Sequence, residues 1–258
     1  LEFRRVLFRS ALGLGLGLLA FAPAAWLARA VGSATQQRLQ LVDAQGTVWA
    51  GSALPMLAGP EGSRDAAVLP SRLHWQASPR WLGLRLQLHQ AGHIERPLVL
   101  EWQAGWSSQR LSVPGGPGPL AQWPAAWLAG LGAPLNTLRP DGELQLQSPG
   151  FALLSDAQGW QLEGQAQLAL LRFSSRLSTV EPLGSYQLTL QPQGEHRIGL
   201  RLSTLDGALR LSGQGEIGPK GLRLRGEAQA APGQEAPLNN LLNILGRREG
   251  ALSRLSIG

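Results

Sequence analysis

The sequence predicts a mainly β protein: a single N-terminal transmembrane helix, then an exported, largely antiparallel curled β-sheet domain with one or two short covering helices. Three observations support this fold class. One long apolar run lies near the N-terminus, apolar and polar residues alternate through most of the later chain, and two later segments have helical spacing. Strict alternation is typical of half-buried strands, because successive side chains point to opposite faces of a sheet.

The apolar run occupies residues 11–30 and carries no charge as far as Ala28. As a helix, this uncharged stretch is about 27 Å long, the short end of what crosses a bilayer. Arginines in residues 1–10 precede it, as basic residues precede both signal peptides and retained anchors. Small residues near Pro23 resemble a cleavage site, but the run continues to Leu27. We therefore expect a retained transmembrane anchor, with a cleaved signal peptide as the alternative.

The ends of the run define the predicted organisation. Residues 1–10 read LEFRRVLFRS without an initiator methionine, and we interpret them as a cytoplasmic tail or as a cloning or assembly scar. Everything after the run is expected to be exported, as one β domain in two halves, residues 31–118 and 119–258. The division falls in a Gly/Pro-rich connector at residues 112–120. A domain of this size buries a sizeable core without disulfides, and the chain has no cysteine.

The clearest strand pattern lies between residues 184 and 230, where four strands and three turns are predicted. The middle turn is Asp206-Gly207, which favours a type I′ hairpin because both central residues of that turn need positive φ. One face of this predicted meander is apolar and includes Leu188, Leu200, Leu211 and Leu224. The other face is polar, so we expect an antiparallel sheet with one face packed and one face solvated.

Two segments depart from alternation. Residues 119–135 and residues 235–248 have helical spacing, and we expect both to be helices that cover one end of the apolar face. In the second segment, Pro237 stands near the start and Gly246 near the end, as is common for helix termini. Residues 57–71 are interpreted as a loop.

The composition argues against several classes of function. The net charge is +6, but only 16% of residues are charged, below the usual ~25%, and the arginines are scattered. We therefore expect no nucleic-acid partner. Histidines and carboxylates are dispersed, and no serine lies in a nucleophile elbow. We expect no catalytic residue, no metal site and no cofactor, and hence no enzyme.

Tryptophan is abundant, with nine residues in the chain. Those beyond the apolar run are Trp49, Trp75, Trp81, Trp102, Trp106, Trp123, Trp127 and Trp160. Taken singly, each is interpreted as a core residue, because aromatic side chains dominate burial. The alternative is that some line a groove or an interface, where tryptophan is enriched.

Several segments, taken in their order and spacing, can be compared with those of a known family. The stretch GTVWAGSA, at residues 46–53, comes soon after the single apolar run. Together with residues 184–190, 204–217 and 222–246, it resembles the N component of the bacterial type II secretion system. The resemblance covers roughly the whole chain after the run. The residues singled out from these segments, for folding or interaction, are Gly46, Trp49, Gly51, Asp206 and Gly207.

The resemblance implies a single-pass protein of the bacterial inner membrane, with most of the chain in the periplasm. Such a protein would be an accessory component that assists export of folded periplasmic proteins across the outer membrane through protein–protein contacts. The implied partners are other secretion-system subunits, in the inner-membrane platform or the secretin, and the inner membrane itself through residues 11–30. The alternative is an AsmA-like periplasmic module that binds or transfers lipid, with the four leucines named above forming an apolar groove. A closed core is the third interpretation of that face.

Overall fold

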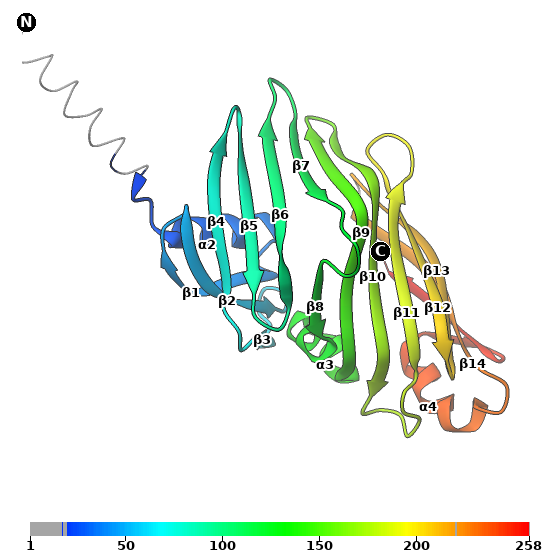
Figure 1. The fold of residues 1–258 in the computed structure, drawn as a ribbon. Coiled ribbons are helices and arrows are strands. Elements are labelled where there is room, and N and C mark those ends of the chain that lie inside the picture. The colour runs from blue at the N-terminus through cyan, green and yellow to red at the C-terminus, as the bar shows by residue number, and fades with distance from the viewer. Residues whose placement is uncertain (1–16, 18–19, 220, 258) are drawn as a thin grey trace, which may run out of the picture.

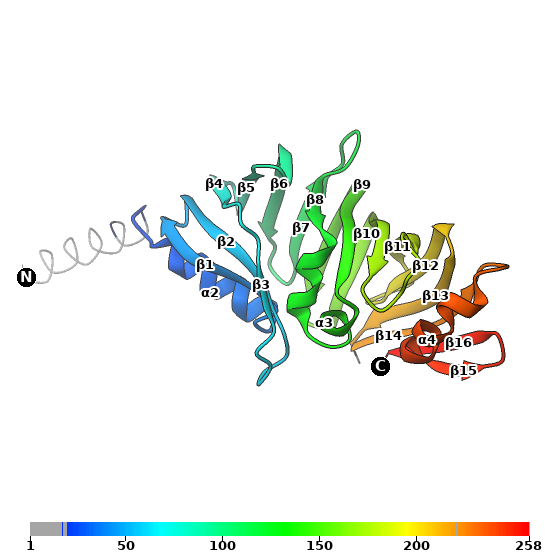
Figure 2. The same cartoon turned by 90° about the horizontal axis from the view of Figure 1, so that it is seen from below.

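One continuous sheet forms the body of the protein. The computed structural model describes residues 17, 20–219 and 221–257, and these residues form an antiparallel sheet of sixteen strands that curls into an open trough (Figure 1). Figure 2 shows the helices along one side of the arched sheet. The prediction of a mainly β, largely antiparallel, curled sheet is therefore confirmed.

The strands succeed one another along the chain. The first half contains β1 (Leu39–Gly46), β2 (Ala50–Ala58), β3 (Ala66–Val68), β4 (Leu73–Arg80), β5 (Gly83–Gln90), β6 (Ile94–Ala104), β7 (Gln109–Pro114) and β8 (Ala121–Pro124). The second half contains β9 (Pro140–Asp156), β10 (Gly159–Ser175), β11 (Gly184–Pro192), β12 (Ile198–Gly207), β13 (Leu209–Gly218), β14 (Gly221–Ala230), β15 (Arg247–Glu249) and β16 (Leu252–Ile257). The helical segments among the described residues are α2 (Ala24–Ala34), the 3-10 helix η1 (Ala125–Leu131), α3 (Leu135–Leu138) and α4 (Glu235–Leu245).

The order of strands in the sheet nearly repeats their order in the chain. The path runs from β1 through β2, β4, β5, β6 and β7 to β9, and then on to β14, β16 and β15. The short strands β3 and β8 pair with β2 and β9 beside this path. Pairing of β7 with β9 joins the two halves across the Gly/Pro-rich connector. The path ends in two edge strands, β1 at one end and β15 at the other, and the short β3 and β8 beside it each pair with one strand.

Strand register places the predicted apolar positions on one face. Leu188 of β11 lies opposite Leu202 of β12, two residues from Leu200. Gly215 of β13 lies opposite Leu200 on one side and opposite Leu224 on the other. Because side chains alternate along a strand, these leucines share a face with Leu211. The four-strand meander predicted over residues 184–230 is thus observed as β11 to β14.

The two ends of the strands form different rims. At one end lie the turns that join β1 to β2, β4 to β5, β6 to β7, β9 to β10, β11 to β12 and β13 to β14, and we call this end the hairpin rim. Several of these turns are visible along the top of the sheet in Figure 1. At the other end lie α3, α4 and the β10–β11 loop, and we call it the helical rim.

Helix α4 covers the apolar face at the helical rim. Leu238, Leu241 and Leu242 are buried, and they belong to one cluster with Tyr186 and Leu209 of the sheet. The helix ends at Leu245 and Gly246 comes directly after it, as the spacing of residues 235–248 predicted.

The helix expected over residues 119–135 is wrong in part. Ala121–Pro124 forms strand β8, and only the later residues are helical, as η1 and the single turn α3. Pro124 precedes η1 and Pro134 precedes α3, and Gly132 between them has φ +84°. Proline removes a backbone donor and is tolerated only in the first turn of a helix, so a continuous helix is interrupted here.

The predicted anchor at residues 11–30 lies largely outside the described residues. The part that is described divides at Pro23, and Ala24–Ala34 forms α2, which packs against β1. Ala24 is buried and Leu27 packs beside Ala53 and Trp75, so this part of the run belongs to the domain. Within residues 17, 20–219 and 221–257, no helix has both the length and the apolar character needed to cross a bilayer.

Candidate functional site

Two glycines shape the turn of the GTVWAG segment. Gly46 has φ +86°, and a Cβ there would lie 2.5 Å from the carbonyl oxygen of Ala50. A Cβ at Gly51 would lie 2.5 Å from the Trp75 ring and 2.6 Å from the Gln45 carbonyl oxygen. Real Cβ atoms do not approach other heavy atoms this closely, so both positions require glycine. The ring of Trp75 then fits over Gly51 in the core.

The same turn joins three parts of the chain. The indole nitrogen of Trp75 donates a hydrogen bond to the Thr47 carbonyl oxygen at 3.1 Å. The Val48 amide donates to the Ala22 carbonyl oxygen at 2.9 Å, and Ala77 of β4 donates to the Trp49 carbonyl oxygen at 2.6 Å. The turn containing Gly46, Trp49 and Gly51 therefore fixes Ala22, within the N-terminal apolar run, to the sheet.

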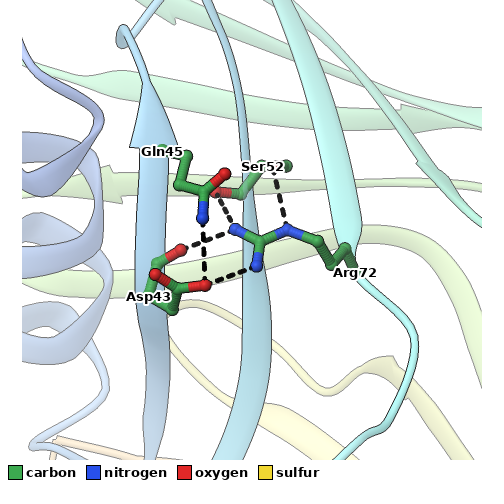
Figure 3. Close-up of polar contacts among 4 residues, drawn as sticks. All are labelled: Asp43, Gln45, Ser52 and Arg72. Atoms are coloured by element: carbon green, nitrogen blue, oxygen red, sulfur yellow. Dashed lines mark hydrogen bonds and ion pairs between the residues drawn. The ribbon is translucent and has the colours of Figure 1, made fainter.

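A second polar cluster, which the sequence did not point to, ties β1 to β2 (Figure 3). Arg72 Nη1 donates to Asp43 Oδ2 and Nη2 donates to the Asp43 carbonyl oxygen, both at 2.6 Å. Arg72 Nε donates to Ser52 Oγ at 3.1 Å, and Gln45 Nε2 donates to Asp43 Oδ2 at 3.1 Å. Asp43 has φ +51° and lies in a bulge of β1 between Val42 and Gln45. The guanidinium group thus holds the bulge in place.

This cluster makes a pH-dependent contribution to stability. Hydrogen bonds from Arg72 and then Gln45 hold the pKa of Asp43 below its usual value. A lowered folded-state pKa means that the contribution is complete above the unfolded value of about 3.9 and is lost as pH falls through the folded pKa. We expect Asp43→Asn to lower the urea midpoint near neutral pH and to have a smaller effect in acid.

The measurement for Asp43 is the difference in urea midpoint between the variant and the unmodified chain, at several pH values. Using this difference cancels the titration of the other carboxyl groups, and Arg72→Gln should reproduce the same pH profile. A difference that stays constant from neutral pH into acid would contradict the role assigned to the Arg72–Asp43 pair.

The Asp206-Gly207 turn is in the predicted place but has a different geometry. Gly207 has φ +124°, whereas Asp206 is not among the described residues with positive φ, so the type I′ turn is wrong. Ladder pairing of β12 with β13 stops at Leu202, because the Thr204 hydroxyl donates to the Leu211 carbonyl oxygen at 2.7 Å and accepts from its amide at 2.6 Å. Meanwhile β12 stays paired with β11 as far as Gly207.

The contacts around this turn hold the neighbouring strands together. A Cβ at Gly207 would clash with Gly184 Cα and would lie 2.5 Å from the Leu183 carbonyl oxygen. The nearby Tyr186 hydroxyl donates to the Leu209 carbonyl oxygen at 2.9 Å. Burial, and to a lesser extent the charge of Asp206, raises the pKa of Tyr186, so the phenol keeps its proton and remains a donor.

The four leucines proposed as an apolar groove are unequally covered. Leu200 is 7% exposed, whereas Leu188, Leu211 and Leu224 are half-buried. Leu211 packs against the cluster that α4 covers. These leucines belong to β11 to β14, while Gly46, Trp49 and Gly51 lie at the β1–β2 end of the strand order, so the structure forms two separate groups.

Two further predictions from the sequence concern metal ligands, of which no cluster is expected, and the tryptophans, which are expected in the core. Within the part of the chain that is described, no group of three or more histidine, aspartate and glutamate side chains is placed to hold a metal ion. Trp75 is buried as expected, and Trp123 packs on Trp127 with ring centroids 5.9 Å apart. The core interpretation is wrong for the tryptophans whose side chains are exposed, namely Trp81, Trp102, Trp106 and Trp160. Alternation alone could not identify them, because it predicts a face and not where a strand ends.

Comparison with known proteins identifies the family. The family model described as type II secretion system (T2SS), protein N, matches residues 37–253, from just before β1 into β16. No curated protein and no solved structure matches the chain. Because the match spans nearly the whole sheet, the chain belongs to the family of type II secretion system protein N.

Proposed function

We propose that this chain is an accessory component of the type II secretion system that acts through protein–protein contacts in the periplasm, without catalysis. The apolar residues that precede Pro23 hold it in the inner membrane, because Ala24–Ala34 packs on the sheet as α2, and the sheet lies on the periplasmic side. The observation that carries the proposal is the family match, which covers the sheet from β1 to β16. The unit shared with the family is thus the sheet itself, and its exposed edges are available to other subunits of the machine.

Of the two edge strands, β1 is the better place for a partner strand. An unpaired edge offers a row of backbone donors and acceptors to which an extended segment can be added. The opposite edge, β15, has only three residues, and Arg247 and Glu249 are two of them. Short and charged edge strands discourage pairing. The Thr35 hydroxyl already bonds the amide and the carbonyl oxygen of Leu39, and β1 has a bulge after Val42. Residues 40–42 are therefore the regular part of the edge, and we propose that a platform or secretin subunit pairs there.

The test is purification of the tagged full chain from native membranes in mild detergent, with mass spectrometry of proteins and lipids. The chain has no cysteine, so Gln40→Cys in β1 gives one site for a bifunctional cross-linker. We expect secretion-system subunits to co-purify and the Gln40→Cys chain to cross-link to one of them. Ala91→Cys, in the exposed β5–β6 turn, is the matched control and should give no such adduct.

Two outcomes would oppose the proposal. Phospholipid retained in a fixed ratio, without secretion-system subunits, would favour the lipid-binding alternative. Equal cross-linking from Gln40→Cys and Ala91→Cys would remove the assignment of the contact to β1.

A further inference from the structure

The hairpin rim carries large apolar side chains in water. Trp81 is 94% exposed and Leu82 66% exposed at the β4–β5 turn, and Trp106 is fully exposed at the β6–β7 turn. Trp160, 56% exposed, comes just after the β9–β10 turn. Single exposed apolar residues are common on proteins, but several at the tips of neighbouring hairpins call for a partner.

The β4–β5 turn is unfavourable for the fold that contains it. Arg80 pairs with Gly83, so Trp81 and Leu82 alone form the loop. Two-residue hairpin loops favour Asn, Asp and Gly because they need positive φ. Leu82 has φ +56°, a left-handed conformation that is unfavourable for a residue with a Cβ. Neither side chain gains burial in return, so their presence is explained by a contact outside the domain.

The tips are adjacent to one another. The Ala104 amide donates to the Leu82 carbonyl oxygen at 2.8 Å, which places the β4–β5 turn beside the end of β6. Gln109, at the start of β7, lies opposite Ser155 near the β9–β10 turn. Figure 1 shows the β4–β5, β6–β7 and β9–β10 turns in succession along the same rim. The turns that carry Trp81 and Trp106, and the turn just before Trp160, therefore follow one another along one rim.

The N-terminal apolar run joins the domain at this rim. The β1–β2 turn belongs to the hairpin rim, and its Val48 amide donates to the carbonyl oxygen of Ala22 at 2.9 Å. Thr47 of the same turn forms an isolated bridge with Pro23. Ala22 and Pro23 therefore lie at the hairpin rim, where Trp81 and Trp106 are exposed. If the apolar residues that precede Ala22 in the sequence lie in a bilayer, the rim lies near its surface.

We propose that the hairpin rim inserts Trp81, Leu82 and Trp106 into the interfacial region of the phospholipid bilayer that holds the apolar residues before Pro23. This inference rests on the proposed membrane attachment. Tryptophan favours the membrane–water interface because its ring is apolar and its N–H finds a partner among head groups. The PRWLG and AGWSSQ tips contain Arg80 and no carboxylate, so an anionic lipid surface does not repel them.

The experiment uses the full chain in vesicles of phosphatidylethanolamine with a minor fraction of phosphatidylglycerol. A polarity-sensitive fluorophore is attached to the cysteine of Ser107→Cys, beside Trp106. Because the chain has no cysteine of its own, this is the single site of labelling. We expect a blue shift of emission and strong quenching by lipids with nitroxide-labelled head groups. The matched control is Ala91→Cys, which lies in the turn at the opposite end of β5 and β6 and should show water-like emission without quenching.

A second variant separates insertion from folding. The double substitution Trp81→Ser and Leu82→Gly, made in the Ser107→Cys chain, removes the apolar side chains of the β4–β5 tip. Glycine at position 82 also adopts the positive φ without strain. We expect a loss of most of the blue shift and quenching, together with a thermal midpoint that is unchanged or higher. A retained blue shift with this variant would overturn the assignment of insertion to the tips.

The remaining outcomes distinguish the two proposals. If the chain floats with vesicles but the labels at residues 107 and 91 behave alike, insertion of the rim is wrong, and the proposed membrane attachment is still supported. If the chain does not float with vesicles, the membrane attachment fails, and this inference fails with it. If the residue 107 label is shielded only after detergent-extracted membrane proteins are added, the rim binds a protein and the lipid proposal is overturned.

Discussion

Gly207→Val is expected to lower the free energy of unfolding by more than about 3 kcal/mol. At φ +124° a β-branched residue is strained. The new Cβ would also clash with Gly184 Cα and lie 2.5 Å from the Leu183 carbonyl oxygen, so β11 and β12 must separate. Neither contact is with a flexible side chain that could move aside. The measurement is urea unfolding monitored by circular dichroism.

The matched control for Gly207→Val is Gly233→Val. Gly233 also has positive φ, at +82°, but a Cβ there would meet no atom within 4 Å. The control therefore carries the backbone strain alone, and we expect it to cost about 1–2 kcal/mol. If the two variants unfold at the same urea concentration, the close approach of the two strands is not what requires glycine at position 207.

Leu242→Ala is expected to cost about 3 kcal/mol, within the range of roughly 2–5 kcal/mol for leucine removed from a core. Leu242 is 1% exposed in α4 and belongs to the cluster that includes Leu209 and Tyr186. Its carbonyl oxygen also accepts a hydrogen bond from the buried Ser253 hydroxyl at 2.7 Å. Because the helix is held from both sides, it cannot easily move into the cavity, and the full cost should appear.

Asn240→Ala, on the exposed side of the same helix, provides the comparison for Leu242→Ala. Alanine has the higher helix propensity, so the midpoint should stay the same or rise by a few tenths of a kcal/mol. A similar loss in both variants would mean that α4 is disturbed as a whole, and that packing of Leu242 on the sheet does not decide its stability.

Much of the architecture could be predicted from the sequence where side-chain periodicity and turn residues agree. In β11 to β14 apolar and polar residues alternate over most of each strand, with a break at Leu205, and glycines lie at or next to the turns. Helix α4 could be predicted for the same reason, since its apolar stripe is bounded by Pro237 and Gly246. Local signals specify both, so no knowledge of distant contacts was needed.

Other features depend on contacts that a local pattern does not contain. Leu82 continues the alternation of β5, and only the pairing of Arg80 with Gly83 shows that Trp81 and Leu82 form a turn. At Asp206 the local preference for a type I′ turn is overridden, because β11 extends β12 to Gly207. Arg72 and Asp43 are distant in the chain, and the bulge of β1 brings them together.

The order of strands in the sheet has a consequence for how the chain acquires its structure. Along most of the path each strand pairs with the one synthesised just before it. A chain that emerges N-terminus first therefore offers each new strand an already formed neighbour, and few contacts depend on residues that emerge much later. Contacts that are close in sequence form quickly, because little loop-closure entropy is lost. Assembly from β1 onward would leave one growing edge at a time, until α4 and the short, charged β15 end the sheet.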